Sequence, residues 1–225
     1  MKFKSSSAFT LIEMLTVMVV IAVLASLVVA VQGFAQRKAA TSRAEGEIRT
    51  MAAACESYKG DFGGYPRDLG GQGSNSWTDD LDPREKGDPN SGKYRDACLF
   101  LYKALSGDAE AGVKASEPVP RAGVPDGKPE TKGYFEFIPN QLNKTSSGEI
   151  RYIQDPFGNS YGYSTAGAKV EENYREDVQK NPKASRQKIE GFNPTFDLWS
   201  TGGSSGKNLT GQSLELEQKR WVKNW

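Results

Sequence analysis

The sequence of 225 residues contains no histidine. This absence excludes Ser-His-Asp and Cys-His catalysis, zinc sites with histidine ligands and haem held by histidine. Cysteine is almost as scarce, because Cys55 and Cys98 are the only two. Two cysteines are too few for a four-cysteine zinc site or an iron–sulfur cluster. They could form one disulfide or remain two buried free thiols, and an extracytoplasmic location favours the disulfide.

An excess of either charge is also missing, since 29 lysines and arginines stand against 28 aspartates and glutamates. A protein that binds nucleic acid non-specifically needs a basic surface to displace the counterions of the phosphates. We therefore expect no nucleic-acid partner.

One long apolar run interrupts this polar sequence. Residues 14–31 read MLTVMVVIAVLASLVVAV, without a single charge. As a helix the run spans about 27 Å, close to the roughly 30 Å of a bilayer's hydrocarbon core. We expect one membrane span and one soluble region. Lys2 and Lys4 precede the run and place the N-terminus in the cytoplasm by the positive-inside rule, although Arg37 and Lys38 follow it.

Three interpretations of this segment compete: a cleaved secretory signal, a plain signal anchor, or a more specialised signal. Small residues at positions 28–30 fit a signal-peptidase site, which would leave Val31 as the first residue. Glu13 argues against an ordinary signal peptide, because a carboxylate at the head of an apolar segment costs about 2–3 kcal/mol.

The sequence AFTLIE at residues 8–13, with lysines and serines before it and the apolar run after it, resembles the class III signal of type IV prepilins and pseudopilins. The resemblance implies that a prepilin peptidase cleaves between Ala8 and Phe9 and methylates the new amine of Phe9. It also implies a role for Glu13 in filament assembly. Ala8 stands where the family usually has glycine, and Ala30 where many members have proline.

The helix is expected to continue beyond the membrane. Less polar residues recur at steps of 4 and 3, which places them on one helix face: Ala44, Ile48, Met51, Cys55, Tyr58 and Phe62. The sequence GGYP at residues 63–66 ends the pattern. We predict one spine helix over residues 9–59. The alternative is a membrane anchor joined to a separate helix, with the break at Gly33.

The remainder predicts an α+β fold, with a small globular domain built on a short antiparallel sheet. Expected elements are a helix over 94–105 and strands over 134–138, 150–153, 161–164 and 196–199. Residues 70–93 and 107–132 are predicted loops, 168–190 a solvated and partly helical insertion, and 212–225 a short helix or a strap held by two tryptophans. The predicted organisation is a leader (1–8), a transmembrane half (9–31), a periplasmic amphipathic half (32–60) and a globular pilin-like domain (61–225).

The resemblance extends into this domain. DPFGNSYGY at residues 155–163 is similar to the DPWGNPYxY segment of the major pseudopilin of type II secretion, and GGYP at 63–66 and FDLWS at 196–200 are similar to that family too. Physically, DPFGN predicts a turn: Asp155 accepts from backbone N–H groups, Pro156 fixes φ, and Gly158 with Asn159 takes the positive-φ positions.

Metal sites are not expected. Major pseudopilins carry calcium in the loop that matches residues 201–208, but TGGSSGKN here has no acidic residue, so calcium is doubtful and no other cofactor is expected. The same loop fits a phosphate-binding motif poorly, because Thr201 and Asn208 occupy its glycine and Ser/Thr positions. Four loop aspartates are interpreted as a solvated turn region: Asp79, Asp80, Asp82 and Asp88.

The sequence is thus interpreted as a non-enzymatic, pseudopilin-like subunit of a periplasmic pseudopilus in a type II secretion-like system. It would span the inner membrane once, with its globular domain in the periplasm. Expected partners are further copies, other pseudopilins, the prepilin peptidase and the inner-membrane assembly platform. One alternative is a type IV pilin for adhesion, motility or DNA uptake. Another is a secreted or anchored binding protein, or a histidine-free hydrolase, with an ordinary signal peptide.

Overall fold

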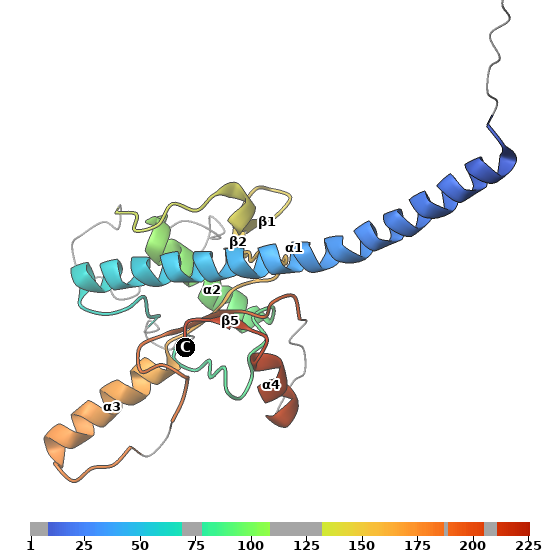
Figure 1. The fold of residues 1–225 in the computed structure, drawn as a ribbon. Coiled ribbons are helices and arrows are strands. Elements are labelled where there is room, and N and C mark those ends of the chain that lie inside the picture. The colour runs from blue at the N-terminus through green and yellow to red at the C-terminus, as the bar shows by residue number, and fades with distance from the viewer. Residues whose placement is uncertain (1–8, 69–77, 109–131, 187–188, 205–210) are drawn as a thin grey trace, which may run out of the picture. The chain divides into compact units, whose positions relative to one another are not determined.

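The structure is a computed structural model that describes residues 9–68, 78–108, 132–186, 189–204 and 211–225 (Figure 1). The chain divides into two compact units, Met1–Ala40 and Thr41–Trp225. Helix α1 (Leu11–Phe62) contributes its first part to one unit and its last part to the other. It runs through Gly33 without a break, so the single predicted helix is confirmed, with a start two residues later and an end three residues later than expected.

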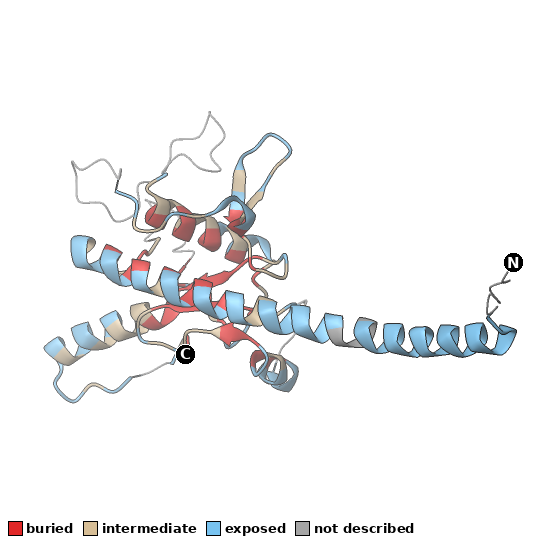
Figure 2. Ribbon diagram, turned by 45° about the horizontal axis from the view of Figure 1, so that its top comes forward, coloured by how far each residue is buried: buried red, intermediate tan, exposed pale blue. Residues whose placement is uncertain are grey.

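In the first unit, α1 has no charged residue between Glu13 and Arg37, and most of its residues there are apolar. Figure 2 shows this part of the helix as exposed, and its large side chains range from Met14 at 50% exposure to Leu11 at 83%. Helix α1 is long and apolar enough to cross a membrane, by length and composition. In water, leaving this surface uncovered costs about 25 cal/mol of free energy for every Å² of apolar area, relative to burying it.

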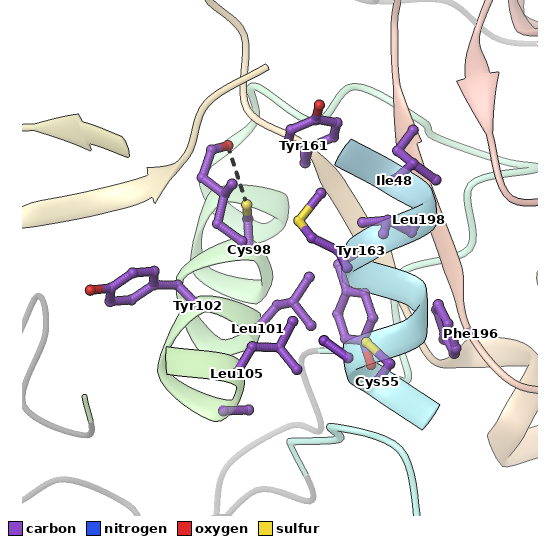
Figure 3. Packing of buried hydrophobic residues seen from close by; sticks show 14 of the residues in the cluster. Ile48, Cys55, Cys98, Leu101, Tyr102, Leu105, Tyr161, Tyr163, Phe196 and Leu198 are labelled. Carbon is purple, nitrogen blue, oxygen red and sulfur yellow. Dashed lines mark hydrogen bonds between the residues drawn. The ribbon is translucent and has the colours of Figure 1, made fainter. Parts of the chain in front are cut away.

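In the second unit, the other part of α1 buries the predicted stripe. Ala44, Ile48, Met51, Cys55 and Tyr58 all belong to one core cluster. Helix α2 (Gly92–Ser106) packs its buried face into the same cluster (Figure 3). Gly107 ends α2 in the left-handed conformation, with φ of 76°, and its N–H donates to the Lys103 carbonyl. Glycine suits this position because it has no Cβ to oppose a positive φ.

Two small antiparallel sheets complete the core. Strand β1 (Leu142–Lys144) pairs with β2 (Ile150–Ile153). The second sheet has the order β3 (Gly162–Ser164), β4 (Asp197–Ser200), β5 (Val222–Lys223). All four residues of the central strand β4 are buried. The α+β class is therefore confirmed, and the strands predicted over 150–153, 161–164 and 196–199 lie within one residue of their expected limits.

The strand predicted over residues 134–138 is wrong. No strand forms there; instead the backbone N–H groups of Tyr134 and Phe135 both donate to the Leu105 carbonyl, at 2.7 and 3.0 Å. The segment thereby satisfies an orphan carbonyl at the end of α2. Its aromatic rings pack rather than alternate, since Phe137 lies 5.1 Å from Tyr102, centroid to centroid. A 3₁₀ helix, η1 (Pro139–Gln141), follows.

A second core lies under the C-terminal residues, which form both a short helix, α4 (Gly211–Gln218), and a strap. Trp221 stacks on Trp199 with 5.9 Å between ring centroids. Gly162 of β3 makes room for this layer, because a Cβ there would lie 2.1 Å from the Trp199 ring. The insertion also contains its predicted helix, α3 (Ala166–Lys180), which is charged and has only Ala166 and Gly167 buried.

Candidate processing and assembly site

The first turn of α1 is closed by a reciprocal pair of side chains. Thr10 directly precedes the helix, and its backbone N–H and hydroxyl each donate to Oε2 of Glu13 at 2.8 Å. The Glu13 N–H in turn donates to Thr10 Oγ1 at 3.3 Å. This is a capping box, in which the N-cap residue and the third helical residue satisfy each other's backbone donors. The spacing T-x-x-E at residues 10–13 is typical of a capping box. The capping box was not predicted from the sequence, because only the charge of Glu13 was considered.

The capping box leaves Glu13 able to accept more. Both Thr10 donors reach Oε2, and Oε1 makes no hydrogen bond to the residues that the structure describes. An ionised carboxylate has about four lone-pair sites, so an additional cation or N–H donor can be accommodated. The positive end of the helix dipole also favours a negative charge in this turn.

The predicted cleavage site adjoins this turn. Phe9 precedes the cap and is 77% exposed. Ala8, like the rest of the predicted leader 1–8, lies outside the described residues. Of the two residues that flank the predicted cleavage site, the structure therefore describes Phe9 alone.

The two cysteines lie elsewhere, inside the core of the second unit (Figure 3). Cys55 on α1 and Cys98 on α2 are both buried and both free in the structure. The Cys98 thiol donates to the Ile153 carbonyl, with 3.6 Å between sulfur and oxygen. Burial raises the pKa of Cys55 above its usual range and that of Cys98 to about 11. Both thiols are thus protonated near neutral pH and are poor nucleophiles.

The predicted DPFGN turn is present and holds one sheet to another. Asp155 Oδ1 accepts from the N–H groups of Phe157 and Asn159, at 3.0 and 2.8 Å, and Gly158 has φ of 88°. The other carboxylate oxygen accepts from the Ser200 hydroxyl of β4 at 2.5 Å. Burial raises the pKa of Asp155, while these hydrogen bonds lower it. The contacts of the Asp155 carboxylate just described hold the turn and β4 in place, and we assign the turn a structural role.

The loop aspartates do not converge on a site. Asp79 is only 3% exposed and pairs with Arg67 at 2.6 Å, so the interpretation of this residue as solvated is wrong. Asp80 pairs with Lys169, while Asp82 and Asp88 accept from backbone N–H groups. Within the described ranges, no group of three or more carboxylate or thiol side chains could hold a metal ion. Half of the loop at 201–208, residues 205–208, lies outside those ranges.

Residues 3–29 match the family model described as the prokaryotic N-terminal methylation motif. The match covers Ala8, Phe9, the capping box and most of the apolar run. No curated protein and no solved structure matches the chain. At the start of its long helix the chain therefore carries the methylation signal of type IV pilins and pseudopilins.

Proposed function

We propose that the chain is a pseudopilin-like structural subunit. A prepilin peptidase cleaves it between Ala8 and Phe9 and methylates Phe9, and the product polymerises into the periplasmic pseudopilus of a type II secretion-like system. The observation that carries the proposal is the methylation motif at 3–29, which leads directly into an exposed apolar helix. The similarity of residues 155–163 to the major pseudopilin favours a pseudopilus over a type IV pilus for adhesion, motility or DNA uptake.

Polymerisation gives the apolar part of α1 a second environment. Its side chains are exposed in the single chain, and lipid covers them before assembly. A subunit that leaves the membrane must bury the same surface against other copies, and packing helix against helix does so. The proposed partners are accordingly further copies, other pseudopilins, the peptidase and an inner-membrane assembly platform. The subunit needs neither a cofactor nor a catalytic residue for this role.

Glu13 supplies the register in this proposal. Among buried helices an unpaired carboxylate costs several kcal/mol. Cleavage creates a positively charged amine on Phe9, and the amine of a neighbouring subunit can relieve that cost only at one axial offset. Oε1 is available for it while Oε2 stays in the capping box. Buried ion pairs of this kind select an arrangement more than they stabilise it.

The first test is the mature N-terminus. Mass spectrometry of the membrane form from cells with an active prepilin peptidase is expected to show a chain that begins with N-methylated Phe9. Loss of residues 1–8 removes Lys2 and Lys4 and changes the side-chain net charge from +1 to −1. A chain that begins at Val31 would support an ordinary signal peptide instead. A chain that still begins at Met1 would mean that Ala8 disables the site.

A second test separates pseudopilus from pilus. Deleting the gene is expected to leave secreted proteins in the periplasm, with adhesion, motility and DNA uptake unchanged. Intact secretion together with loss of one of those surface functions would support the type IV pilin.

A further inference from the structure

A basic groove runs along one side of the second unit. Its cavity of about 780 Å³ lies between the last part of α1 and the segment that contains β5. Twelve residues line this basic groove: Thr41, Glu45, Ile48, Arg49, Ala52, Lys219, Arg220, Trp221, Val222, Lys223, Asn224 and Trp225. A volume of this size lies within the range of known ligand pockets.

The charges of the groove are almost all of one sign. Four of its residues are basic and only Glu45 is acidic, although the whole chain has a net charge of just +1. Arg220 pairs with Glu217 at 3.5 Å, and Lys223 Nζ donates to the Gln218 carbonyl. Arg49 and Lys219 are exposed and form no ion pair with the described residues. These two cations are free to bind an anionic partner.

The aromatic lining adds two more unused donors. The indole Nε1 atoms of Trp221 and Trp225 are both shut off from solvent and lack a hydrogen-bond partner among the described residues. A buried donor without an acceptor destabilises the folded state, because it has lost its hydrogen bonds to water. Because neither atom is exposed, an oxygen acceptor relieves this cost only if the side chains around the indole shift. The groove is therefore rich in donors and poor in acceptors.

Strand β5 offers backbone groups as well. Among the described residues it is the edge strand of the order β3-β4-β5, where Val222 and Lys223 pair with β4 on one side. An extended peptide can add to such an edge through main-chain hydrogen bonds, while alternate side chains enter the neighbouring groove.

We propose that the basic groove binds an extended acidic segment of a partner protein, which lies along β5 and directs its carboxylates to Arg49, Lys219 and Lys223. The described acidic residues of this chain fit the groove less well, because three of the four in α3 are already paired: Glu171 with Arg175 and Arg186, Glu172 with Arg67, and Glu176 with Lys180. The inference stands apart from filament formation, since it rests on the second unit alone.

Fluorine NMR of the full chain tests this assignment. The protein carries 5-fluorotryptophan and sits in phosphatidylcholine nanodiscs, and single Trp→Phe variants assign its four tryptophan signals. The probe is a capped hexapeptide of alternating glutamate and threonine; the comparison peptide has glutamine for glutamate. The acidic peptide is expected to shift the signals of Trp221 and Trp225 more than that of Trp199, which contacts both rings from inside the core, and to bind more weakly as salt rises.

Charge reversal provides the matched variants. Arg49→Glu combined with Lys219→Glu is expected to weaken peptide binding about tenfold or more. Lys144→Glu is the control, because this exposed lysine lies on β1 and does not line the groove. An unchanged Trp199 signal in every variant shows that the core remains folded.

Four results would overturn the proposal. One is the absence of a shift with the acidic peptide, and another is an equal shift with the glutamine peptide. A third is a shift of the two signals when phosphatidylglycerol is added without peptide, which would assign the groove to lipid headgroups. The last is a dependence of the two signals on protein concentration, which would assign it to a second copy.

Discussion

Glu13 combines a local role with a proposed intermolecular one. Within the chain its carboxylate closes the capping box with Thr10, and this alone is a sufficient structural reason for a Glu at the third helical position. In the proposed filament it also meets the Phe9 amine of a neighbour. The two roles make different demands, since a cap needs an acceptor oxygen whereas the ion pair needs a negative charge.

We predict that Glu13→Ala and Glu13→Gln both insert into the membrane and are cleaved after Ala8 but assemble into few or no filaments. Glutamine keeps an acceptor that can complete the capping box, so its failure would isolate the charge. Thr10→Ala is the matched control: it weakens the cap by about 1 kcal/mol, keeps the carboxylate and should still form filaments. Electron microscopy counts the filaments. Normal number and length in Glu13→Gln would show that the charge is incidental.

Asp197 gives the second unit a pH dependence. Its buried carboxylate accepts from the N–H groups of Phe192 and Asn193 at 2.8 and 2.9 Å. Burial is the main cause that raises its pKa to about 6. Unfolded aspartate has a pKa of about 3.9, so between these values the folded state binds more protons than the unfolded state. Stability from this group is therefore present below pH 4 and is lost as pH rises through about 6.

We predict that the free energy of unfolding falls by about 1–3 kcal/mol from pH 4 to pH 7 in the parent chain relative to Asp197→Asn. Asparagine keeps one acceptor oxygen but does not titrate. Because Asp155 also has a raised pKa, only the difference between the two proteins reports on Asp197. Chemical denaturation of the full chain in detergent at several pH values measures this difference. Parallel pH profiles would exclude the contribution.

At the scale of elements, the helices could be predicted and the strands only in part. The stripe of α1 and the face of α2 repeat every three or four residues, so each is visible in a short stretch of sequence. The strands are two to four residues long, and those of the second sheet pair across long stretches of chain, although β1 and β2 are close in sequence. The aromatic residues 134–138 look like a strand locally, but the Leu105 carbonyl decides their backbone pairing.

The candidate site shows the same limit. Phe9 and Glu13 could be proposed as site residues because the motif is contiguous, and the capping box could have been predicted from the spacing of Thr10 and Glu13. The burial of Asp79 could not, because its partners Arg67 and Thr165 come from separate segments. Strand β5, which lines the basic groove, is too short to leave a pattern.

The last part of α1 is an element of the core and not a linker. Met51 is 1% exposed within the main cluster, whereas Ser57 on the same helix is exposed. We predict that Met51→Ala lowers the free energy of unfolding of the second unit by about 2–5 kcal/mol. Ser57→Ala should change it by less than about 0.5 kcal/mol. Denaturation followed by tryptophan fluorescence compares the two, and equal small effects would mean that α1 detaches from the core.

Helices α1 and α2 also carry the two thiols. A disulfide between Cys55 and Cys98 would close a loop of about 43 residues and add about 4 kcal/mol by the chain-entropy estimate. The structure has free thiols, so we predict that unreduced, denatured protein takes up two alkyl groups, and that native protein reacts slowly because both sulfurs are buried. Mass spectrometry counts the adducts. Modification that needs prior reduction would show that the disulfide forms.

At the scale of the whole molecule, the two units differ in how far apart in sequence their contacting residues lie. The first unit needs only consecutive residues of α1, because a helix closes its hydrogen bonds four residues apart. The second unit joins residues that are distant in sequence: Ala44 and Val222 belong to one core cluster. Because the chain is synthesised from its N-terminus, the helix of the first unit can form early, whereas the second unit must wait for its C-terminal residues.

Because Ala44 and Val222 belong to one core cluster, this core can be completed only after the C-terminal residues have been synthesised. During synthesis or export the buried stripe of α1 emerges first. Strand β5, which contributes Val222 to the same cluster, emerges last. Contacts of such long sequence separation form slowly, and exposed apolar surface promotes aggregation while they are incomplete. A chain halted before β5 is therefore expected to keep the stripe of α1 open to chaperones, and folding of the second unit to follow release of its C-terminal residues.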